Sequence, residues 1–409
     1  MRINNNYLKM DNIRSIKVAL AIAAAMTGAT PAIAQEGNFD TIVLTIMAGD
    51  SRTKATIATS RSELETLKAD NTLPDPEVEF SYVWGRHNIG NKLAAGISQS
   101  FEWPGAYVAR SKANQLTEQA IDHYQAMLNS DRKAEISTAL INLIAIRKKI
   151  ALLTQLRQNV DTLLTLTERG FERGETTRLD INKLRIEHIG ISRQLTELQA
   201  EQESALSDLN SYSNGLDCRQ LTSTLDNYPT LTLHPLDTYL TSLTQGDRGS
   251  YLTLSAQSAK MREKATRRST LPGFSLGYEY ELEMGDQFHG LTAGISIPLF
   301  RSSKAIKAAR LSTIAADLNA QADLNEEQAA ITRDYQTALL LREDLTAYGP
   351  ILSNTDHITL LRKAYNGGQL TLLEFLQEAN YFTDAHLTYL TLEHQYHLLL
   401  TTLTRHLPH

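Results

Sequence analysis

The chain alternates between apolar and polar residues over residues 274–283, which read Phe274-Ser275-Leu276-Gly277-Tyr278-Glu279-Tyr280-Glu281-Leu282-Glu283. The same alternation recurs over residues 78–84, 93–103 and 291–299. A period of two over about ten residues is typical of transmembrane β-strands, whose apolar side chains face lipid and whose polar side chains face the lumen. We therefore predict four membrane strands, arranged as two pairs.

Four strands are too few for a barrel made by one chain, because the smallest bacterial barrels have about eight. An open sheet edge within lipid would leave backbone N–H and C=O groups without partners. If these strands cross a membrane, several chains must share one barrel. The alternative is two soluble hairpins packed on a core, but the neighbouring sequence is long helix rather than compact domain.

The polar positions of the predicted strands are rich in glutamate. The lumen-facing set contains Glu79, Glu102, Glu279, Glu281 and Glu283, and we expect no Lys or Arg at an inward position. Rings of acidic side chains favour cations, so the sequence predicts a cation-selective pore. The alternative is that some of these glutamates lie at strand ends and are merely solvated.

Very long helices are predicted beside the strands. Residues 107–169 contain no Pro or Gly and would span about 95 Å as one helix. Residues 303–348 behave similarly, and a helix is expected to resume over residues 351–365 after Gly349 and Pro350. Apolar residues such as Leu140, Leu143 and Ile144 recur at three- and four-residue spacing, which is typical of a coiled-coil seam.

The two halves of the chain follow one plan. Gly174 and Gly368 are 194 residues apart, and so are Pro104 and Pro298. A common offset at two distant positions indicates an internal duplication. We predict a first repeat over residues 35–212, an equatorial connecting segment over 213–249 and a second repeat over 250–409. Each repeat comprises a helix, a strand pair and a long helical hairpin.

Glycine marks the turn at the end of each predicted hairpin. Gly174 lies in the first turn, and Gly367 and Gly368 lie in the second. Glycine supplies the left-handed residue that ends a helix, and Thr177 or Thr371 can begin the next one.

The first 34 residues have the order of regions typical of a secretory signal peptide. Arg14 and Lys17 form the positive region, residues 18–28 form the apolar region, and small residues at 32–34 precede Gln35. The apolar run is shorter than a membrane-spanning helix requires. We expect cleavage after Ala34.

The charge of the chain argues against nucleic acid as a partner. The 409 residues include 40 basic and 46 acidic residues. Removal of residues 1–34 takes away four basic residues and one acidic residue, which leaves 36 and 45 and a net charge of −9. Backbone phosphates require clusters of Lys and Arg. Cys218 is alone, so no intramolecular disulfide is expected.

The chain resembles the TolC family of outer-membrane efflux proteins over essentially the whole mature length. The strand-to-helix junction and its repeat carry the resemblance, and they read Ser98-Gln99-Ser100-Phe101-Glu102-Trp103-Pro104-Gly105 and Ile295-Ser296-Ile297-Pro298-Leu299-Phe300. The second turn and the helix start after it also match, as Tyr365-Asn366-Gly367-Gly368 and Leu372-Leu373-Glu374-Phe375-Leu376. The motifs look closest to the heavy-metal, RND-type branch.

The resemblance implies a homotrimer in the outer membrane of a Gram-negative bacterium. Its barrel would have twelve strands, four from each chain, continuous with a periplasmic tunnel of twelve helices. The channel would passively conduct substrate to the exterior from an inner-membrane RND or ABC pump, through a periplasmic adaptor protein. The tip of the tunnel would be closed and would open when these partners dock.

In family members, acidic residues and a Tyr–Arg network hold the periplasmic tip closed. Asp180, Tyr365 and Glu374 fall on such positions in this sequence. The alternative for Asp180 and Glu374 is that they are acids at helix N-termini, favoured by the macrodipole, and both roles can hold. Leu370 stands where the best-known member has an arginine, and Gln377 stands where it has a second acid. The chain therefore departs from the family's full charge network.

Histidines gather near the C-terminus, at His386, His394, His397, His406 and His409. The first three fall near one helical face, but no Cys accompanies them and Glu393 points elsewhere on the helix. A metal site needs three or four converging ligands. We expect satisfied histidines on the helix surface, and neither a metal nor a cofactor.

The sequence contains no nucleophile elbow, phosphate-binding glycine loop or HExxH motif, so no enzyme is expected. The main alternative function is a periplasmic coiled-coil adaptor or scaffold of an export complex, which shares long helical hairpins. Such a protein usually has one hairpin flanked by compact β domains, whereas two hairpins and two strand pairs are predicted here. The sequence does not distinguish between metal ions, drugs and proteins as the substrate.

Overall fold

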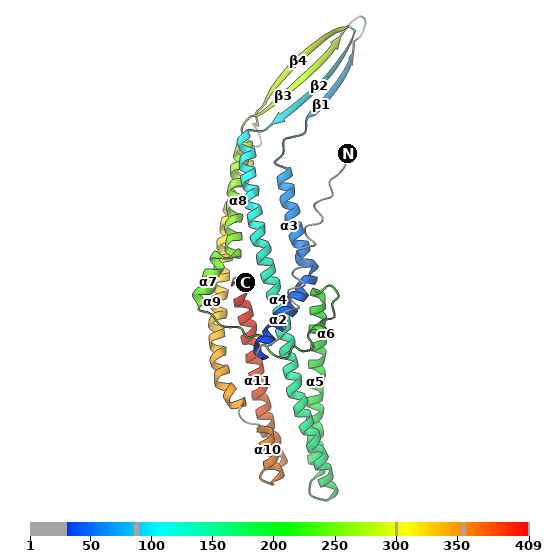
Figure 1. Cartoon of the computed structure of the whole chain (residues 1–409), viewed down its shortest axis with the longest axis vertical. Coiled ribbons are helices and arrows are strands. Elements are labelled where there is room, and N and C mark those ends of the chain that lie inside the picture. The colour runs from blue at the N-terminus through cyan, green and yellow to red at the C-terminus, as the bar shows by residue number, and fades with distance from the viewer. Residues whose placement is uncertain (1–30, 86–89, 299–301, 354–356, 408–409) are drawn as a thin grey trace.

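The computed structural model describes residues 31–85, 90–298, 302–353 and 357–407. Figure 1 shows an elongated molecule with a sheet at one end and two helical hairpin turns at the other. Residues 1–30 of the predicted signal peptide and His409 lie outside the described residues. The expected cleavage position lies within the first described helix, α2 (Pro31–Gly49).

Four strands form one antiparallel sheet in the order β1-β2-β3-β4, which confirms the strands predicted from the alternation. β2 and β3 join the two halves of the chain, with Ala95 opposite Tyr280. β4 begins earlier than predicted, because Met284 and Gly285, at φ 51° and 98°, make a two-residue hairpin turn directly after β3. The strands are β1 (Glu77–Trp84), β2 (Asn91–Phe101), β3 (Gly273–Glu283) and β4 (Asp286–Ser296).

Long helices continue from the sheet. The first predicted long helix is confirmed as α4, which has 69 residues. Within the described ranges, no helix combines the length and the apolar character needed to cross a membrane. The long helices are α3 (Ser51–Ala69), α4 (Pro104–Glu172), α5 (Arg178–Tyr212), α8 (Asp247–Ser269), α9 (Ser302–Ser353) and α11 (Leu372–Thr404), and the short α10 (His357–Asn366) precedes α11.

The prediction that a helix stops at Gly349 and resumes at Ile351 is wrong. α9 runs through Pro350 to Ser353, and α10 begins at His357. A proline removes the hydrogen bond from its own nitrogen to the carbonyl four residues earlier, but it does not prevent one further turn. The described part of α9 therefore continues past the proline to Ser353.

The predicted apolar seam of α4 forms the core of the helical part. Leu140, Leu143 and Ile144 are fully buried against α2, α5 and the connecting segment. Nearer the turns, Leu163 of α4 packs with Leu184 of α5 and with residues of α11 in a second cluster. α4 thus contacts α3 and α8 toward the sheet, and α5 and α11 toward the turns.

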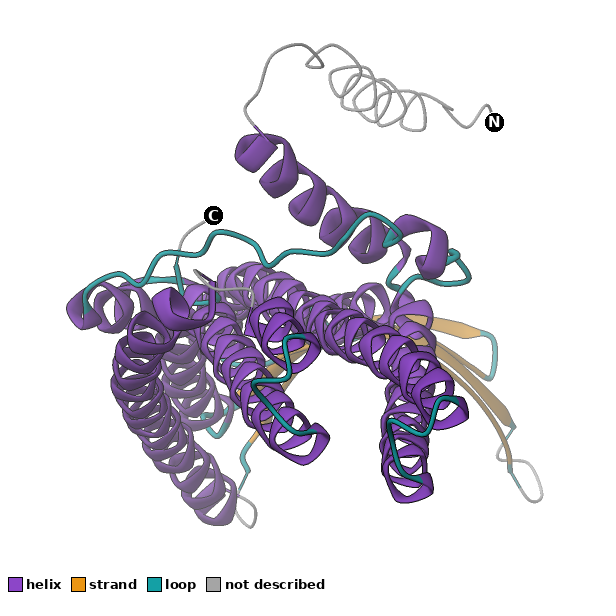
Figure 2. Ribbon diagram, turned by 90° about the horizontal axis from the view of Figure 1, so that it is seen from below, coloured by secondary structure: helices purple, strands orange, loops and turns teal. Residues whose placement is uncertain are grey.

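The connecting segment lies on the convex side of the arch that the helices form (Figure 2). It contains the short helix α6 (Cys218–Leu221) and the helix α7 (Leu236–Gln245). The sequence pattern predicts no helix in this segment, because α7 is short and buries only Tyr239 and Leu243. Arg147 of α4 fixes the segment by donating to the carbonyl oxygens of Thr222 and Leu225.

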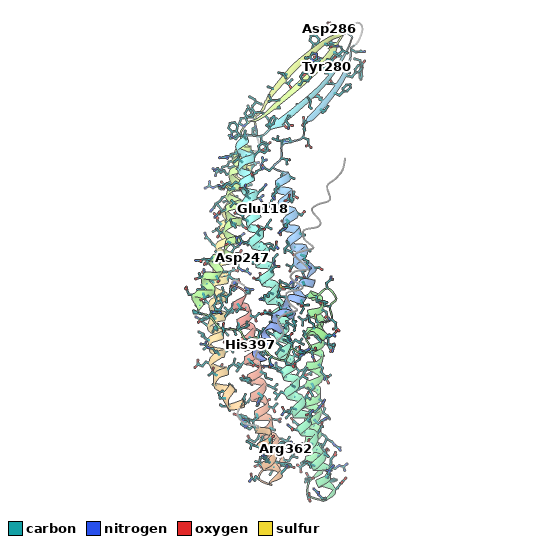
Figure 3. All side chains as sticks on the ribbon, in the orientation of Figure 1. Glu118, Asp247, Tyr280, Asp286, Arg362 and His397 are labelled. Carbon is teal, nitrogen blue, oxygen red and sulfur yellow. The ribbon has the colours of Figure 1, made fainter. Side chains whose placement is uncertain are left out.

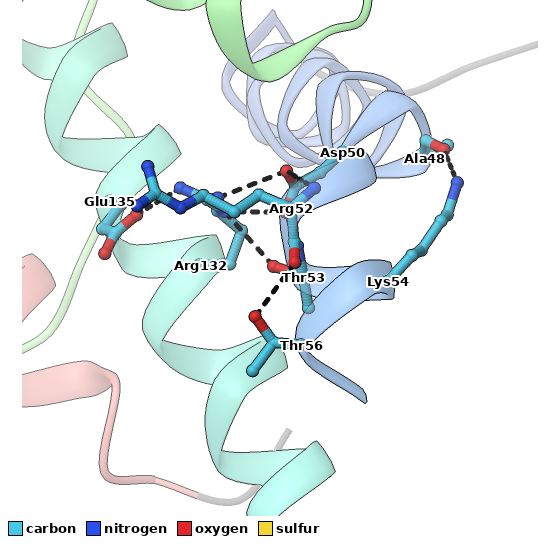
Figure 4. Close-up of polar contacts among 8 residues, drawn as sticks. All are labelled: Ala48, Asp50, Arg52, Thr53, Lys54, Thr56, Arg132 and Glu135. Atoms are coloured by element: carbon cyan, nitrogen blue, oxygen red, sulfur yellow. Dashed lines mark hydrogen bonds and ion pairs between the residues drawn. The ribbon is translucent and has the colours of Figure 1, made fainter. Parts of the chain in front are cut away.

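An ion pair between Asp50 and Arg132 links the start of α3 to α4 (Figure 4). Asp50 caps α3 by accepting from the N–H groups of Arg52 and Thr53, at 3.1 and 3.2 Å. The same carboxylate accepts from Arg132 Nε of α4 at 2.8 Å. The Arg132 guanidinium also lies over the ring of Tyr212, at the end of α5, 4.9 Å from its centroid. This junction, Asp50–Arg132–Tyr212, fixes α3, α4 and α5 at one level.

Candidate functional site

The first hairpin turn is closed by a Schellman motif. Gly174 has φ 74°, a conformation that glycine adopts without strain. Its N–H donates to Phe171 O at 3.0 Å, and Glu175 N–H donates to Gly170 O at 2.8 Å. These two bonds satisfy carbonyl groups that the end of α4 would otherwise leave unpaired.

The second turn repeats this construction. Gly368 has φ 70°, its N–H donates to Tyr365 O at 3.0 Å, and Gln369 N–H donates to Ala364 O at 2.9 Å. Gly367 has no positive φ, and Arg173 occupies its place in the first turn. Of the three predicted glycines, Gly174 and Gly368 are therefore required by the backbone, and Gly367 is not.

The two predicted tip acids occupy equivalent positions after these turns. Asp180 and Glu374 are each the third residue of their helix and complete a capping box with Thr177 and Thr371. The Asp180 carboxylate accepts from Thr177 Oγ1 at 2.6 Å, and the Glu374 carboxylate accepts from Thr371 N and Oγ1, both at 2.8 Å. These bonds lower the pKa of both carboxyl groups, through the threonine hydroxyl first for Asp180 and the threonine N–H first for Glu374.

Tyr365 packs within its own hairpin. Its ring lies against Phe375, with centroids 5.7 Å apart, and it is partly buried on the cluster shared by α4, α5 and α11. Within the part of the chain that the structure describes, no hydrogen bond joins Tyr365 to Asp180 or Glu374. The fold of one chain brings Tyr365 and Glu374 into one turn, and it places Asp180 on the other hairpin.

The sheet has two chemically distinct faces. Residues opposite one another in an antiparallel sheet share a face, so the register assigns every strand residue. One face is apolar and aromatic, and in the single chain it is exposed: Leu291 is 89% and Trp84 is 77% exposed. The opposite face carries the acids Glu77, Glu79, Glu279, Glu281, Glu283 and Asp286.

The expectation that no basic residue shares the acidic face is wrong. Lys92 lies opposite Glu283 in the register, and its Nζ is 2.8 Å from Glu281 Oε2. β2 begins at Asn91 rather than Leu93, and this earlier start brings Lys92 into the sheet on the inward side. One lysine therefore partly offsets the acids of each chain.

The assignment of Glu102 to the strands is also wrong. β2 ends at Phe101, and Glu102 lies in the junction before α4. Its carboxylate forms an ion pair with Arg110, one helical turn and a half into α4. Glu102 therefore fixes the strand-to-helix junction, while Glu77 and Asp286, which the sequence analysis did not select, belong to the acidic face.

The four C-terminal histidines that the structure describes, His386, His394, His397 and His406, are half-buried rather than exposed on the helix surface. His397, which lies near the middle of the molecule (Figure 3), stacks on Tyr228 of the connecting segment with centroids 4.3 Å apart. Burial, and then the Lys148 charge, lowers the pKa of His397 to about 4. His394 contacts Asn142 Oδ1 at 2.7 Å, and burial lowers the pKa of His406 to about 3. Among the described residues, no three His, Cys, Asp or Glu side chains form a metal-binding group.

Long helical hairpins below a four-stranded sheet with two unpaired edges define a known fold, that of outer-membrane channel proteins. VceC, an outer membrane protein of Vibrio cholerae, matches with a TM-score of 0.75 and 13% identity over 90% of this chain and 96% of its own. The CmeC outer membrane channel of Campylobacter jejuni matches with a TM-score of 0.72 and 15% identity over 90% and 85%.

The open-state MtrE outer membrane channel of Neisseria gonorrhoeae matches with a TM-score of 0.66 and 14% identity over 93% of both chains. The sequence itself matches no protein-family model and no curated protein. The comparisons therefore confirm the expected fold.

Proposed function

We propose that this chain is the outer-membrane channel subunit of a bacterial export system, in the TolC family. The single observation that supports this most directly is the sheet, which has one exposed apolar face and one acidic face. Such a sheet suits a wall between lipid and water. In this proposal the sheet lies in the outer membrane, and the helical part extends into the periplasm.

The two free edges of the sheet support a barrel shared between chains, and three chains are the number that the family resemblance implies. β1 and β4 each pair with only one strand, so each chain offers two rows of unpaired backbone groups. Pairing β1 of one chain with β4 of the next would close a barrel of twelve strands and would satisfy these groups. The exposed apolar residues of α9, such as Leu311 and Leu318, would then face a neighbouring chain.

Detergent-solubilised protein should have the mass of three chains when the detergent contribution is subtracted, for example by light scattering. A stable, folded monomer in detergent would refute the shared barrel. Fractionation adds a second discriminator: this proposal requires the protein in outer-membrane fractions. A periplasmic adaptor or scaffold would instead be released with the soluble periplasmic contents.

In the same proposal, the hairpin turns form the periplasmic tip, with Gly174, Gly367 and Gly368 in the turns. Asp180, Tyr365 and Glu374 would take part in a gate, and a trimer would gather six carboxylates from Asp180 and Glu374 at one opening. An adaptor protein and an RND or ABC pump would dock there and deliver drugs, metal ions or, in type I secretion, proteins. The existence of a structure of an open state for MtrE supports a gate in a channel of this fold.

We also propose that the chain is a duplication, with repeats over residues 35–212 and 250–409 and a connecting segment over 213–249. The matched Schellman turns and capping boxes support this division. Each residue of the first capping box lies 194 positions before its equivalent in the second, and the same offset relates the two turn glycines with positive φ.

A further inference from the structure

A cavity of about 420 Å³ lies between α3, α4 and α8, in the helical part nearer the sheet. Its walls carry hydroxyl groups, two tyrosine rings and one guanidinium, that of Arg262 on α8. The only carboxylate that the described residues place in the wall is that of Glu63, which is exposed and does not contribute to the charge environment of Arg262. The cavity belongs neither to the hairpin turns nor to the acidic face of the sheet.

The guanidinium of Arg262 has no acidic partner among the described residues. Three other basic residues of α8 do have one: Arg248 pairs with Asp131, Lys260 with Asp317 and Arg267 with Glu263. A half-buried charge without a counter-charge is costly, and burial accordingly lowers the pKa of Arg262. A ligand with a negative charge would remove this cost.

Two hydroxyl groups hold the guanidinium in place. Arg262 Nη2 donates to Thr117 Oγ1 at 3.1 Å, and Nε donates to Ser258 Oγ at 3.4 Å. Both hydroxyls are themselves anchored on the Ala113 carbonyl oxygen, at 3.0 and 3.2 Å. A guanidinium has five N–H donors, so most of them stay available to an anion in the cavity.

Two tyrosines form an aromatic wall of the same cavity. The rings of Tyr124 and Tyr251 lie 5.1 Å apart, with an angle of 32° between their planes. Burial raises the pKa of Tyr251, so its hydroxyl stays neutral at physiological pH. The aromatic ring of a ligand would pack against these two tyrosines while the negatively charged group of the same ligand binds Arg262.

We propose that this cavity binds aromatic carboxylates, with the carboxylate on Arg262 and the aromatic ring against Tyr124 and Tyr251. The site lies in the wall of the helical part, and binding there requires no pump, adaptor or membrane potential. It can therefore be tested on the purified protein, whatever the outcome of transport experiments.

Isothermal titration calorimetry of the detergent-solubilised protein with benzoate tests the proposal. Benzoate should bind, Arg262→Gln should weaken its binding by about tenfold, and benzyl alcohol should bind more weakly than benzoate. Arg268→Gln is the matched control, because Arg268 lies on the same helix and donates to the Gly105 carbonyl outside the cavity. Arg268→Gln should leave the affinity for benzoate unchanged. Absence of benzoate binding, or equal binding by Arg262→Gln, would overturn the site.

Inorganic phosphate separates an aromatic carboxylate site from a simple anion site. Phosphate that binds as tightly as benzoate would overturn the aromatic assignment. A measurement on the unmodified protein covers the case in which Arg262→Gln does not fold: crystals soaked with 4-bromobenzoate should give an anomalous bromine peak beside Tyr124 and Tyr251. A bromine peak only at other places would contradict the proposal.

Discussion

At the scale of single residues, Asp180 and Glu374 have a local task that the structure describes fully. Each carboxylate closes a capping box and accepts a bond from the threonine that begins its helix. Both carboxyl groups are therefore held in the charged form to lower pH than usual. The gate proposed above would use the same charges, and variants can separate the two roles.

We predict that replacing Asp180 and Glu374 together by Ala raises single-channel conductance in planar bilayers or admits larger solutes. The double replacement removes two carboxylates from each chain, and therefore six from the proposed tip of a trimer, where they would help to keep the opening narrow. The matched pair is Asp180→Asn with Glu374→Gln, which removes the charge and keeps an oxygen that can accept from the threonine.

If the Asn and Gln variant also raises conductance, the negative charges keep the gate closed. If only the double Ala variant raises it, the hydrogen bonds of the capping boxes keep the gate closed. Unchanged conductance and solute exclusion in both would leave the two acids as helix caps only.

His397 should make the stability of the fold depend on pH, and the direction of this dependence follows from its pKa. The folded state lowers its pKa from 6.5 to about 4, so between these values the unfolded chain binds the proton more strongly. Stability is therefore highest above pH 6.5 and falls as the pH drops toward 4, by about 3 kcal/mol for a shift of this size.

His397→Phe keeps the stack on Tyr228 and has no proton to bind. It should narrow the difference in Tm between pH 7 and pH 4.5, measured by circular dichroism; an unchanged difference would contradict the assignment. His406 shifts in the same direction and stays in both proteins, so part of the pH-dependence should persist.

At the scale of elements, the sequence predicts the strands well because one apolar and one polar face of the sheet require a period of two. It fails at strand ends, where a shift of two residues decides whether Lys92 lies in the sheet. It also fails for partners distant in the chain. The ion pair of Glu102 with Arg110 depends on the angle between strand and helix, and the burial of His397 depends on Tyr228 of a segment with little periodicity.

The composition of the acidic face predicts cation selectivity. In a KCl gradient, the sign of the reversal potential should show that the channel prefers potassium over chloride. This selectivity should weaken at about 1 M salt, where the Debye length is roughly 3 Å. Lys92→Gln should increase the selectivity, because it removes the one basic residue found on this face among the described strand residues.

Arg193→Gln is the control, since Arg193 is exposed on α5 and pairs with Glu197 far from the sheet. Anion selectivity would mean that the two faces of the sheet are assigned the wrong way round.

At the scale of the whole molecule, the offset of 194 residues is the most informative feature of the sequence. It relates Gly174 to Gly368 and Thr177 to Thr371, and these pairs have the same backbone geometry and hydrogen bonds. The proposed closure of the barrel and of the tip could not be predicted in the same way. Both would depend on contacts between chains, for which one chain shows only free sheet edges and exposed apolar residues.

Export should remove residues 1–34. Mass spectrometry of the protein purified from membranes should find an N-terminus at Gln35, either unmodified or cyclised to pyroglutamate, because the small residues before it are typical of a signal-peptidase site. Ala34→Pro should block this cleavage, whereas the unmodified chain should be fully processed. A mature protein that retains the apolar segment would contradict the prediction.

Because α4 is one continuous helix, the Asp50–Arg132–Tyr212 junction would act as a pivot if α4 tilted. From Arg132 the helix extends about 60 Å to the first hairpin turn and about 40 Å to the sheet, at 1.5 Å per residue. If α4 tilts by about 5° as a rigid lever about this point, its two ends move by roughly 5 and 4 Å in opposite directions. In the proposed channel, a small rearrangement at this junction would therefore be amplified at the hairpin turn, where the tip opening would lie.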